Sequence, residues 1–504
     1  MVLRIPPSPP LTESEVETMY RELVGNHRVL PAGKAVISGF VDEVCSFLEP
    51  GAAGKIRGVF DRHLAGEKGD MDLAPMVDRL CEQIAPAGFE PVIQKHALKA
   101  QAEIRRMAGT IQSALDGIGA EARIVFIATK PYFQVLREAA VLRRNGFACA
   151  LICLDRVPDP MRPAFDEAFD HILDDIRNPG VLARLLETLE VDILHVQCWM
   201  WSYYLARIAI ERKKNARVVC EIYDFTSVYA PRDVLARNWP REMVDTDLAM
   251  EKFLCTRADA VTHRYHPVID DELRERHGGL VRTFYMQPWP ARVVEPAPGG
   301  KLSGRDGILR MVYAGGIMPD MPDTPPELFT PRSMPRTFRA LLEQGFHIDL
   351  LHDPHRPIAR QKGIDEYHLL VEDFPGFRLL DGVSPDRLPE TLSTYDFGLV
   401  LTHIDRDILQ VGPGLLRGAI GTKVFSYVEA GIPSIVCKEY EYTAEIVETY
   451  NLGLALMTHE IETCGDRIRS FDRAACEAAI RRFGAEHSME REIGKLIALY
   501  REIL

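Results

Sequence analysis

Two rounds of short apolar runs alternating with amphipathic helical patterns occupy the chain from about residue 122 onward. Runs such as ARIVFIAT (122–129) and ARVVCEIYD (216–224) alternate with helical segments such as LREAAVLRRNG (136–146). Strands that are apolar throughout are buried on both faces, and helices between them make the connections parallel. The pattern predicts an α/β protein with doubly wound parallel sheets.

The alternation stops in a Pro- and Gly-rich stretch, Pro288 to Gly307, and restarts with ILRMVYAGG (308–316). A chain of 504 residues is too long for one core, so two Rossmann-like domains are expected. Before Leu115 the periodicity is helical, with no clear strand. The predicted units are a helical N-terminal extension over 1–118, Rossmann-like domains over 119–290 and 308–470, a linker over 291–307, and C-terminal helices over 471–504.

Composition excludes several classes of protein. The net charge of −13 argues against nonspecific binding to nucleic acid or to an anionic membrane. No apolar run reaches the roughly 18 residues of a membrane-spanning helix, and the N-terminus MVLRIPPSPPLTESE lacks the apolar core of a signal peptide. The ten cysteines lack paired metal-ligand spacing, which predicts buried thiols in a reducing cytoplasm. No cluster of metal ligands stands out elsewhere in the sequence.

The segment GTKVFSYVEAGIPSIV (421–436) predicts a helix start, a short helix and a Gly-Ile-Pro turn into a buried strand. A helix start beside a sheet edge offers N–H groups and a positive dipole end to a diphosphate. Lys423 in the first turn opposes the dipole unless an anion is bound there. We therefore predict that Thr422 and Lys423 bind phosphate, the alternative being that Lys423 is a solvated surface residue.

The same segment resembles the donor-binding signature of GT-B glycosyltransferases, Lys-apolar-Phe-x-Tyr-x-x-x-Gly-x-Pro. The order of the first strand, of CTRADAVTHRYHPVIDDEL (255–273) and of FRLLDGVSPDRLPETLSTYDFGLVLT (377–402) is similar to that of family-4 enzymes across about residues 122–504. The resemblance implies two Rossmann-like domains that bind a nucleotide diphosphate sugar, without a bound metal or a separate cofactor.

Further donor-binding residues follow from this resemblance. Gly315 and Gly316 resemble the turn whose backbone approaches the donor phosphates, because glycine allows the closest approach; a plain strand-to-loop turn is the alternative. Gly382 and Val383 resemble the loop that reads the nucleobase, although a simple turn has the same pattern. His403 directly follows a strand and precedes a glycine-rich stretch, which predicts either a ligand-covering loop or a solvent-facing hinge.

At two positions this sequence differs from the pattern of family-4 enzymes. Many family-4 enzymes carry glutamates eight residues apart, and these places fall on Gly418 and Ser426. Ser426 could bond a ribose hydroxyl, and Glu429, three residues further, could substitute because it shares the same helix face. The other interpretation of Glu429 is a capping or packing residue. The missing glutamates leave open whether the reaction retains or inverts the anomeric configuration.

Candidate residues for chemistry lie after strands of the first domain. Asp224 could accept a proton from an acceptor hydroxyl, or cap a helix. His263 ends a strand and could position the acceptor or a donor phosphate, the alternative being an ordinary polar surface residue. Trp199 and Trp201 could stack on a sugar ring as acceptor-binding residues, or belong to the core. His195, inside an apolar strand, is expected to be a core histidine.

The leading functional hypothesis is a metal-independent glycosyltransferase that moves a sugar from a nucleotide diphosphate sugar to a hydroxyl of a glycan, lipid-linked or protein acceptor. It would act in the cytoplasm, and the N-terminal helices could mediate homo-oligomerisation. The missing glutamates motivate an alternative, a catalytically inactive GT-B scaffold that serves as a binding or assembly partner. A third hypothesis is a sugar-nucleotide epimerase on the same double-Rossmann architecture.

Overall fold

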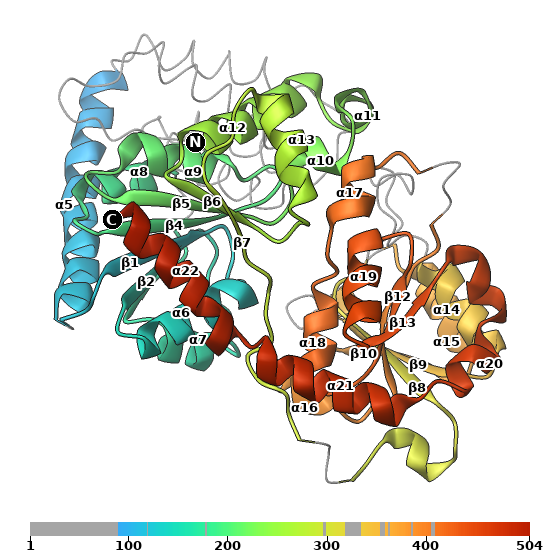
Figure 1. Cartoon of the computed structure of the whole chain (residues 1–504). Helices are drawn as coiled ribbons and strands as arrows, with labels where there is room; N and C mark the ends of the chain where they lie inside the picture. Colours follow the sequence, from blue (N-terminus) through green and yellow to red (C-terminus); the bar gives the residue numbers. More distant parts are fainter. Residues whose placement is uncertain are drawn as a thin grey trace, which may run out of the picture.

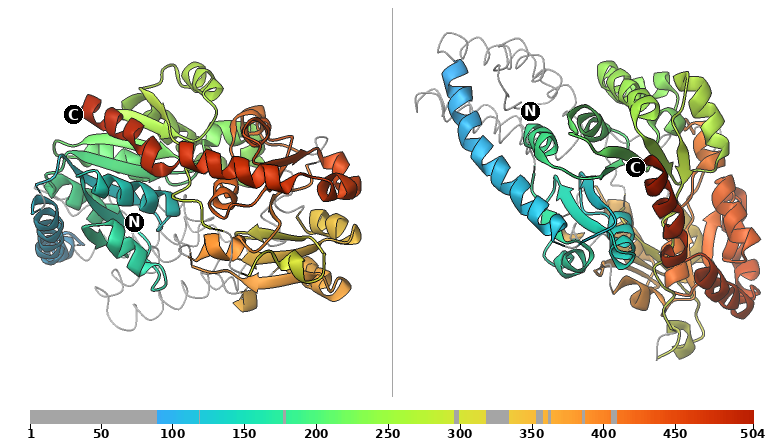
Figure 2. Two further views of the ribbon diagram at one scale, coloured as in Figure 1. Left: turned by 60° about the horizontal axis from the view of Figure 1, so that its bottom comes forward. Right: turned by 60° about the vertical axis from the view of Figure 1, so that its left-hand side comes forward.

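The computed structural model describes residues 89–504, except for 118, 177–178, 296–298, 318–333, 353–357, 361–362, 385–386 and 405–408. Side chains are described from residue 103 onward, apart from 179, 180 and 360 and these gaps. Most of the predicted helical extension, residues 1–88, lies outside the described residues. Helix α5 (Phe89–Asp116), which falls within that extension, runs along the outside of the first domain and packs on α8, β2 and β3 (Figures 1 and 2).

The first domain is a seven-stranded parallel sheet with the order β3-β2-β1-β4-β5-β6-β7. Its strands are β1 (Arg123–Ala128), β2 (Ala148–Cys153), β3 (His171–Leu173), β4 (Ile193–Cys198), β5 (Arg217–Ile222), β6 (Ala260–His263) and β7 (Thr283–Tyr285). Its helices after α5 are α6 (Phe133–Arg144), α7 (Arg162–Ala168), α8 (Pro179–Thr188), α9 (Tyr204–Arg212), α10 (Thr226–Tyr229), α11 (Arg232–Asn238), α12 (Arg241–Arg257) and α13 (Val268–His277).

The second domain is a six-stranded parallel sheet with the order β10-β9-β8-β11-β12-β13. Its strands are β8 (Arg310–Ala314), β9 (His347–His352), β10 (Phe377–Asp381), β11 (Phe397–Val400), β12 (Ser434–Cys437) and β13 (Gly453–Leu456). Its helices are η2 (Leu302–Arg305), α14 (Met334–Glu343), η4 (Ile358–Arg360), α15 (Asp365–Asp373), α16 (Leu388–Leu392), α17 (Pro413–Gly418), α18 (Lys423–Glu429), α19 (Glu441–Thr449), η5 (Thr458–Thr463) and α20 (Gly465–Arg469).

These two doubly wound sheets confirm the predicted fold class (Figure 1). In each sheet the strand order reverses once, between β1 and β4 in the first domain and between β8 and β11 in the second. Connections leave in opposite directions on the two sides of such a switch point, which opens a crevice at the carboxyl ends of the strands. The topology therefore marks one ligand-binding edge on each domain.

The predicted C-terminal helices divide between the two domains. Helix α21 (Arg473–Glu486) packs on α18 of the second domain, with Ile480 and Phe483 in the same apolar cluster as Phe425. Helix α22 (Met489–Ile503) returns to the first domain, where Leu496 and Tyr500 lie in the core against α6 (Figure 1). The chain end therefore completes the core of the domain in which the doubly wound pattern begins.

A buried tyrosine holds the switch point of the second sheet together. The Tyr427 hydroxyl accepts a hydrogen bond from the Ala314 N–H (3.2 Å) and lies 3.0 Å from the Leu399 carbonyl oxygen and 3.2 Å from that of Val312. Its ring fits only because residue 398 is glycine, since a Cβ at Gly398 would lie 2.2 Å from the ring. Tyr427 thus bridges β8 and β11 where the crevice opens.

The described residues also bear on membrane insertion and on the state of the cysteines. Among the described residues, no helix combines the length and the apolarity needed to cross a bilayer. Every cysteine in the described part of the chain is a buried free thiol. Burial raises the pKa of Cys437 to about 12, which makes that thiol unreactive at neutral pH.

We predict that Gly398→Ala destabilises the second domain, because the added methyl group overlaps the Tyr427 ring in a packed core. Overpacking of this kind costs about 1–3 kcal/mol, or about 3–10 °C in the melting temperature of a domain of this size. Gly304→Ala is the control, since a Cβ at Gly304 meets nothing within 4 Å. Equal thermal melting of the two variants would contradict the assigned packing.

Candidate active site

The carboxyl ends of the two sheets are turned toward each other. Helix α17, which follows β11, packs against α10 and α13, which follow β5 and β6. Two backbone hydrogen bonds join these segments: the Gly412 N–H donates to the Tyr229 carbonyl (2.7 Å), and the His266 N–H donates to the Gly418 carbonyl (2.9 Å). The two edges marked by the switch points are therefore on the sides where the domains meet.

This contact explains one departure from the family-4 pattern. A Cβ at Gly418 would lie 2.6 Å from Ile269 Cγ1 and 3.4 Å from the Tyr265 ring. A glutamate at this position would force α17 away from α13. The neighbouring Arg417 pairs with Glu272 across the same contact. In this chain the first glutamate position is therefore part of the interdomain packing.

Three of the predicted donor-binding residues lie together at the end of β8. A Cβ at Gly315 would meet Lys423 Cε at 2.7 Å and Lys423 Nζ at 3.3 Å, and the backbone φ of Gly315 is +148°. Lys423 Nζ lies 5.0 Å from the centre of the Tyr313 ring, whose hydroxyl donates to the Gly316 carbonyl (3.0 Å). The φ of Gly315 favours glycine at this position, and the absence of a side chain there leaves room for the end of the Lys423 side chain.

The approach of the Gly315 turn to donor phosphates stays a prediction, and the structure shows two other features of this residue. Its N–H donates to the Leu351 carbonyl on β9 (2.9 Å), so this amide belongs to the sheet. What Gly315 provides is space: without a side chain there, the Lys423 ammonium reaches the carboxyl end of β8. The sequence reasoning also missed Tyr313, whose signal was its place on the same strand, two residues before the glycine.

Thr422 and Ser426 lie along the first half of α18. Thr422 occupies the N-cap position, and its side chain forms no capping hydrogen bond. Ser426 is half-buried one turn further along the same helix. Both residues are therefore on the helix that carries Lys423, and their contacts with a donor stay a prediction.

Gly382, Val383 and His403 follow other strands of the second sheet. Gly382 and Val383 come directly after β10, the edge strand, and are half-buried. His403 follows β11 and is buried, with Nδ1 3.0 Å from Thr337 Oγ1. Burial and the nearby Arg336 lower the pKa of His403, which favours the neutral imidazole. These three residues share the carboxyl edge with Gly315 and Lys423.

Glu429 joins the two domains. Its carboxylate accepts hydrogen bonds from the Arg137 guanidinium on α6 and from the Ala291 N–H (2.7 Å). Arg137 also donates to the carbonyls of Pro288 (3.2 Å) and Trp289 (3.3 Å), which hold the start of the linker. Burial raises the pKa of Glu429, although the charge of Arg137 opposes this shift. The pair fixes the end of α18 against the first domain.

Asp224 lies at the carboxyl end of β5. Its Oδ1 accepts hydrogen bonds from Arg264 Nη2 (2.9 Å) and from the Tyr265 hydroxyl (3.3 Å). The Arg264 guanidinium also lies over the Tyr223 ring, 4.7 Å from its centre. The Asp224 side chain is 36% exposed, whereas that of Arg264 is 16% exposed. This arrangement holds a carboxylate in place at the ligand-binding edge and leaves it accessible to a substrate hydroxyl.

The imidazole of His263, which could position the acceptor or a donor phosphate by the sequence prediction, is buried. Its side chain is 1% exposed, and Nε2 lies 2.7 Å from Asp270 Oδ1. Asp270 in turn accepts from the Thr283 hydroxyl (2.5 Å), and the Phe225 and Tyr285 rings lie against the imidazole. Direct contact of His263 with a substrate would require these neighbouring rings to move.

Trp199 lies at the switch point of the first sheet. It follows β4, and Lys130 and Tyr132, which follow β1, lie beside it. Lys130 Nζ is 4.8 Å from the centre of the Trp199 ring, and the Tyr132 and Trp199 ring centres are 6.2 Å apart. Sequence reasoning missed Lys130 and Tyr132, although their place directly after the first strand of the domain was a usable signal. Together they form an aromatic and cationic edge.

Trp201 has a strained backbone next to this edge. Its φ of +70° is in the left-handed region, which a bulky residue adopts only when its surroundings hold it there. The Trp201 N–H donates to Asp247 Oδ1 (3.1 Å), and its ring packs 5.2 Å from that of Trp239. Asp247, buried on α12, also accepts a hydrogen bond from the Thr226 hydroxyl (2.5 Å).

Comparison with known proteins supports the architecture. No family model matches the chain, and no curated protein matches it in sequence. Among solved structures, Anabaena Alr3699/HepE in complex with UDP and glucose matches 76% of this chain and 100% of its own length, with a TM-score of 0.55 and 13% identity. The complex of the same protein with UDP-glucose matches 75% of this chain and 100% of its own length, with a TM-score of 0.51 and 12% identity.

A Thermobaculum terrenum O-GlcNAc transferase mutant matches 97% of this chain and 98% of its own length, with a TM-score of 0.49 and 14% identity. At these identities the likeness concerns the fold. The two facing doubly wound sheets and the likeness to the solved structures of Alr3699/HepE define a GT-B fold, as the sequence predicted.

The titration of Asp247 predicts that the melting temperature of the protein depends on pH. Burial raises the pKa of Asp247 to about 7, so between about pH 4 and pH 7 the folded chain holds a proton that the unfolded chain has released. The melting temperature should therefore fall as the pH rises through this window, and Asp247→Asn should reduce that fall. Thermal melting of the wild type and of Asp247→Asn at pH 5 and pH 7.5 measures this effect. An equal change in melting temperature between the two pH values in both proteins would contradict the raised pKa of Asp247.

Proposed function

We propose that this chain is a glycosyltransferase that moves a sugar from a nucleotide diphosphate sugar to an acceptor hydroxyl. The observation that carries the proposal is the contact between Lys423 and Gly315, which brings an ammonium group to the switch point of the second sheet. Ligands of doubly wound sheets bind at such a point. The UDP and UDP-glucose bound by Alr3699/HepE make UDP-sugars the first donors to test.

Lys423 has a defined task in this reaction. As the bond between the sugar and the diphosphate breaks, negative charge grows on the leaving oxygen, and a fixed ammonium nearby stabilises it. The lysine is restrained on one side by the Gly315 turn and on another by the Tyr313 ring, so little reorganisation is needed. Because this cation is supplied by the protein, sugar transfer would need no metal ion on the diphosphate and no separate cofactor.

Asp224 is the proposed general base. Its carboxylate would take the proton from the acceptor hydroxyl while that oxygen forms a bond to the anomeric carbon and the nucleoside diphosphate leaves. Arg264 and the Tyr265 hydroxyl both bind Oδ1, which fixes the carboxylate for this step. The accepting group would belong to a glycan, a lipid-linked acceptor or a protein.

The aromatic edge around Trp199 is the proposed acceptor platform. A sugar ring stacks its C–H face on an aromatic ring, and Trp199 and Tyr132 supply such rings across the switch point of the first sheet. The strained Trp201 lies at the border of this edge. The alternative, a catalytically inactive scaffold, shares the binding surfaces and differs only in turnover.

Lys423→Ala should lower kcat/KM for the donor about 100-fold, because removal of one charge-stabilising group from a transition state costs on the order of 10²–10³ in rate. The assay measures nucleoside diphosphate release over panels of nucleotide sugars and acceptors. Lys438→Ala is the control, since this exposed lysine pairs with Glu448 (3.1 Å). Equal turnover by the wild type and Lys423→Ala would overturn the proposed phosphate contact.

Asp224→Asn should lower acceptor-dependent turnover about 10²- to 10⁴-fold and leave donor binding unchanged, because the amide keeps the shape but cannot take the proton. The matched control is Asp233→Asn, since Asp233 is an exposed partner of Arg237. Calorimetry measures donor binding separately. An altered donor sugar formed without acceptor would indicate an epimerase, and nucleotide binding without any turnover would indicate a scaffold.

A further inference from the structure

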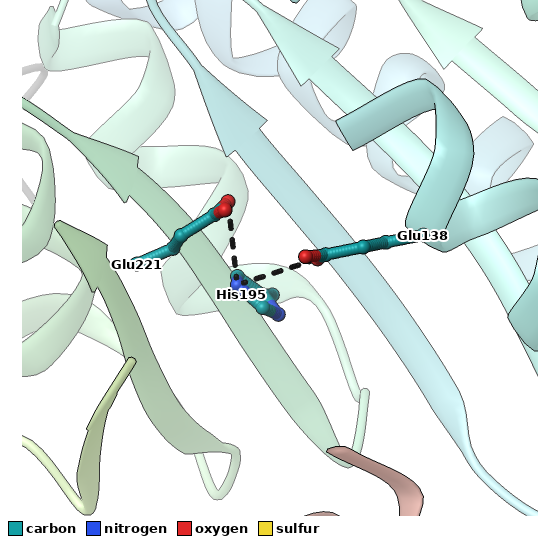
Figure 3. A group of neighbouring side chains, drawn as sticks. All are labelled: Glu138, His195 and Glu221. Atoms are coloured by element: carbon teal, nitrogen blue, oxygen red, sulfur yellow. Dashed lines mark ion pairs between the residues drawn. The ribbon is translucent and has the colours of Figure 1, made fainter. Parts of the chain in front are cut away.

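Three ionisable side chains from separate elements meet inside the first domain, on the face of the sheet covered by α6 and α22. Glu138 comes from α6, His195 from β4 and Glu221 from β5, and Figure 3 shows them pointing toward one another. His195 Nε2 lies 3.7 Å from Glu221 Oε2 and 4.0 Å from Glu138 Oε2. Their side chains are only 1–4% exposed, so water does not reach them from the surface.

The facing atoms have no hydrogen-bond partner within the described part of the chain. These atoms are Glu138 Oε2, His195 Nε2 and Glu221 Oε2. The other ring nitrogen of His195 is bonded to the Tyr500 hydroxyl. If Nδ1 carries the proton and donates it to Tyr500, the lone pair of Nε2 faces both carboxyl groups. Buried polar groups without partners are costly. When both carboxyl groups are ionised, the three facing atoms are all acceptors, which calls for a positive charge between them.

We propose that Glu138, His195 and Glu221 bind a divalent transition-metal ion, for which zinc is the best match. The three ligand atoms all lie within 4.8 Å of one another. Bonds of about 2.0–2.2 Å in a tetrahedral zinc site place ligand atoms about 3.4 Å apart, so small side-chain movements would close the site. A nitrogen and two carboxylate oxygens are ligands that zinc accepts.

The surroundings match those of a metal ligand set. A histidine that binds metal usually has its second nitrogen held by another group, which fixes the tautomer, and Tyr500 supplies that contact here. Gln197 lies beside Glu221 in the ladder between β4 and β5, and neither its Oε1 nor its Nε2 has a partner among the described residues. Its Oε1 is the candidate for a fourth ligand, because Gln197 lies two residues after His195 on the same face of β4.

A shared proton accounts less well for the geometry. Burial raises the pKa of Glu138 to about 8 and lowers that of His195 to about 3, so a proton would reside on a carboxyl group. The gaps of 3.7 and 4.0 Å, however, exceed the length of a hydrogen bond, and a proton would leave them unbridged. A metal ion between the three atoms bonds all of them at once.

The proposed ion would support the acceptor-side edge without touching the substrate. Gln134 donates to Glu138 Oε1 (2.8 Å) and accepts from the Tyr223 hydroxyl (3.0 Å). The Arg264 guanidinium lies over the Tyr223 ring and donates a hydrogen bond to Asp224. An ion that fixes Glu138 would therefore fix the first member of a chain of contacts that ends at the proposed base.

The first experiment measures metal content. The full chain, purified without an affinity tag, is incubated with zinc chloride, passed through a desalting column and analysed for all first-row transition metals by mass spectrometry. We expect about one zinc per chain in the wild type and at least a tenfold loss in Glu138→Gln and His195→Gln. The control is His277→Gln, which removes another buried histidine, paired with Glu251 (2.9 Å), and should keep the metal.

Two outcomes of this measurement overturn the proposal: less than a tenth of a metal ion per chain in the wild type before and after zinc loading, or equal zinc in the wild type and both cluster variants. X-ray absorption at the zinc edge needs only the wild type, so it does not depend on the folding of a variant. It should show nitrogen and oxygen ligands at about 2.0–2.2 Å. Sulfur ligands at about 2.3 Å would place the zinc on cysteines and reject the site.

Two further variants separate a metal ion from a buried proton. With a metal ion, Glu221→Gln should lower the melting temperature, and Tyr500→Phe should weaken zinc about 10- to 100-fold in competition with a chelator. With a proton only, the neutral Glu221→Gln should melt at the same temperature as the wild type or higher, because it removes a buried ionisable group. That second result would overturn the proposal.

Discussion

The single reversal of strand order in each parallel sheet is the constraint on which the rest of the structure depends. Connections that diverge from β1 and β4, and from β8 and β11, leave the carboxyl ends of these strands uncovered. Lys423 and Gly315 lie at one of these openings, and Lys130 and Trp199 lie at the other. In the second sheet, the Tyr427 hydroxyl forms hydrogen bonds with backbone groups of β8 and β11. These bonds fix the two strands relative to each other at the end where the opening lies.

Contacts between the two domains hold the two openings opposite each other. Small residues allow α17 to approach α10 and α13 closely, and a side chain at Gly418 would collide with Ile269. Glu429 and Arg137 add a charged pair that ties α18 to α6 and to the linker. Helix α22 reinforces the arrangement, because the last helix of the chain packs into the core of the first domain. A nucleotide sugar and an acceptor between these edges would face each other.

A buried polar chain runs behind the acceptor-side edge. It starts at Glu138, continues through Gln134 and Tyr223, and reaches Arg264. Each link is a hydrogen bond or a cation–ring contact inside the first domain, where displacement of one member leaves its neighbour unsatisfied. The cluster of Glu138, His195 and Glu221 and the candidate base Asp224 therefore belong to one connected region, although they come from different elements.

The sequence by itself determined the fold class and most of the strands, because these depend on local apolar runs and on glycine positions. Gly315 was grouped with Lys423 only through the resemblance to a family of enzymes. The sequence did not reveal β3 and β7, which span three residues each, or β13, which spans four, because such short strands show little pattern. Only the tertiary structure decided that His263 is buried, that Glu429 pairs with Arg137, and that His195 meets two glutamates. Such contacts join residues far apart in the chain, and packing between elements, which no local pattern encodes, brings them together.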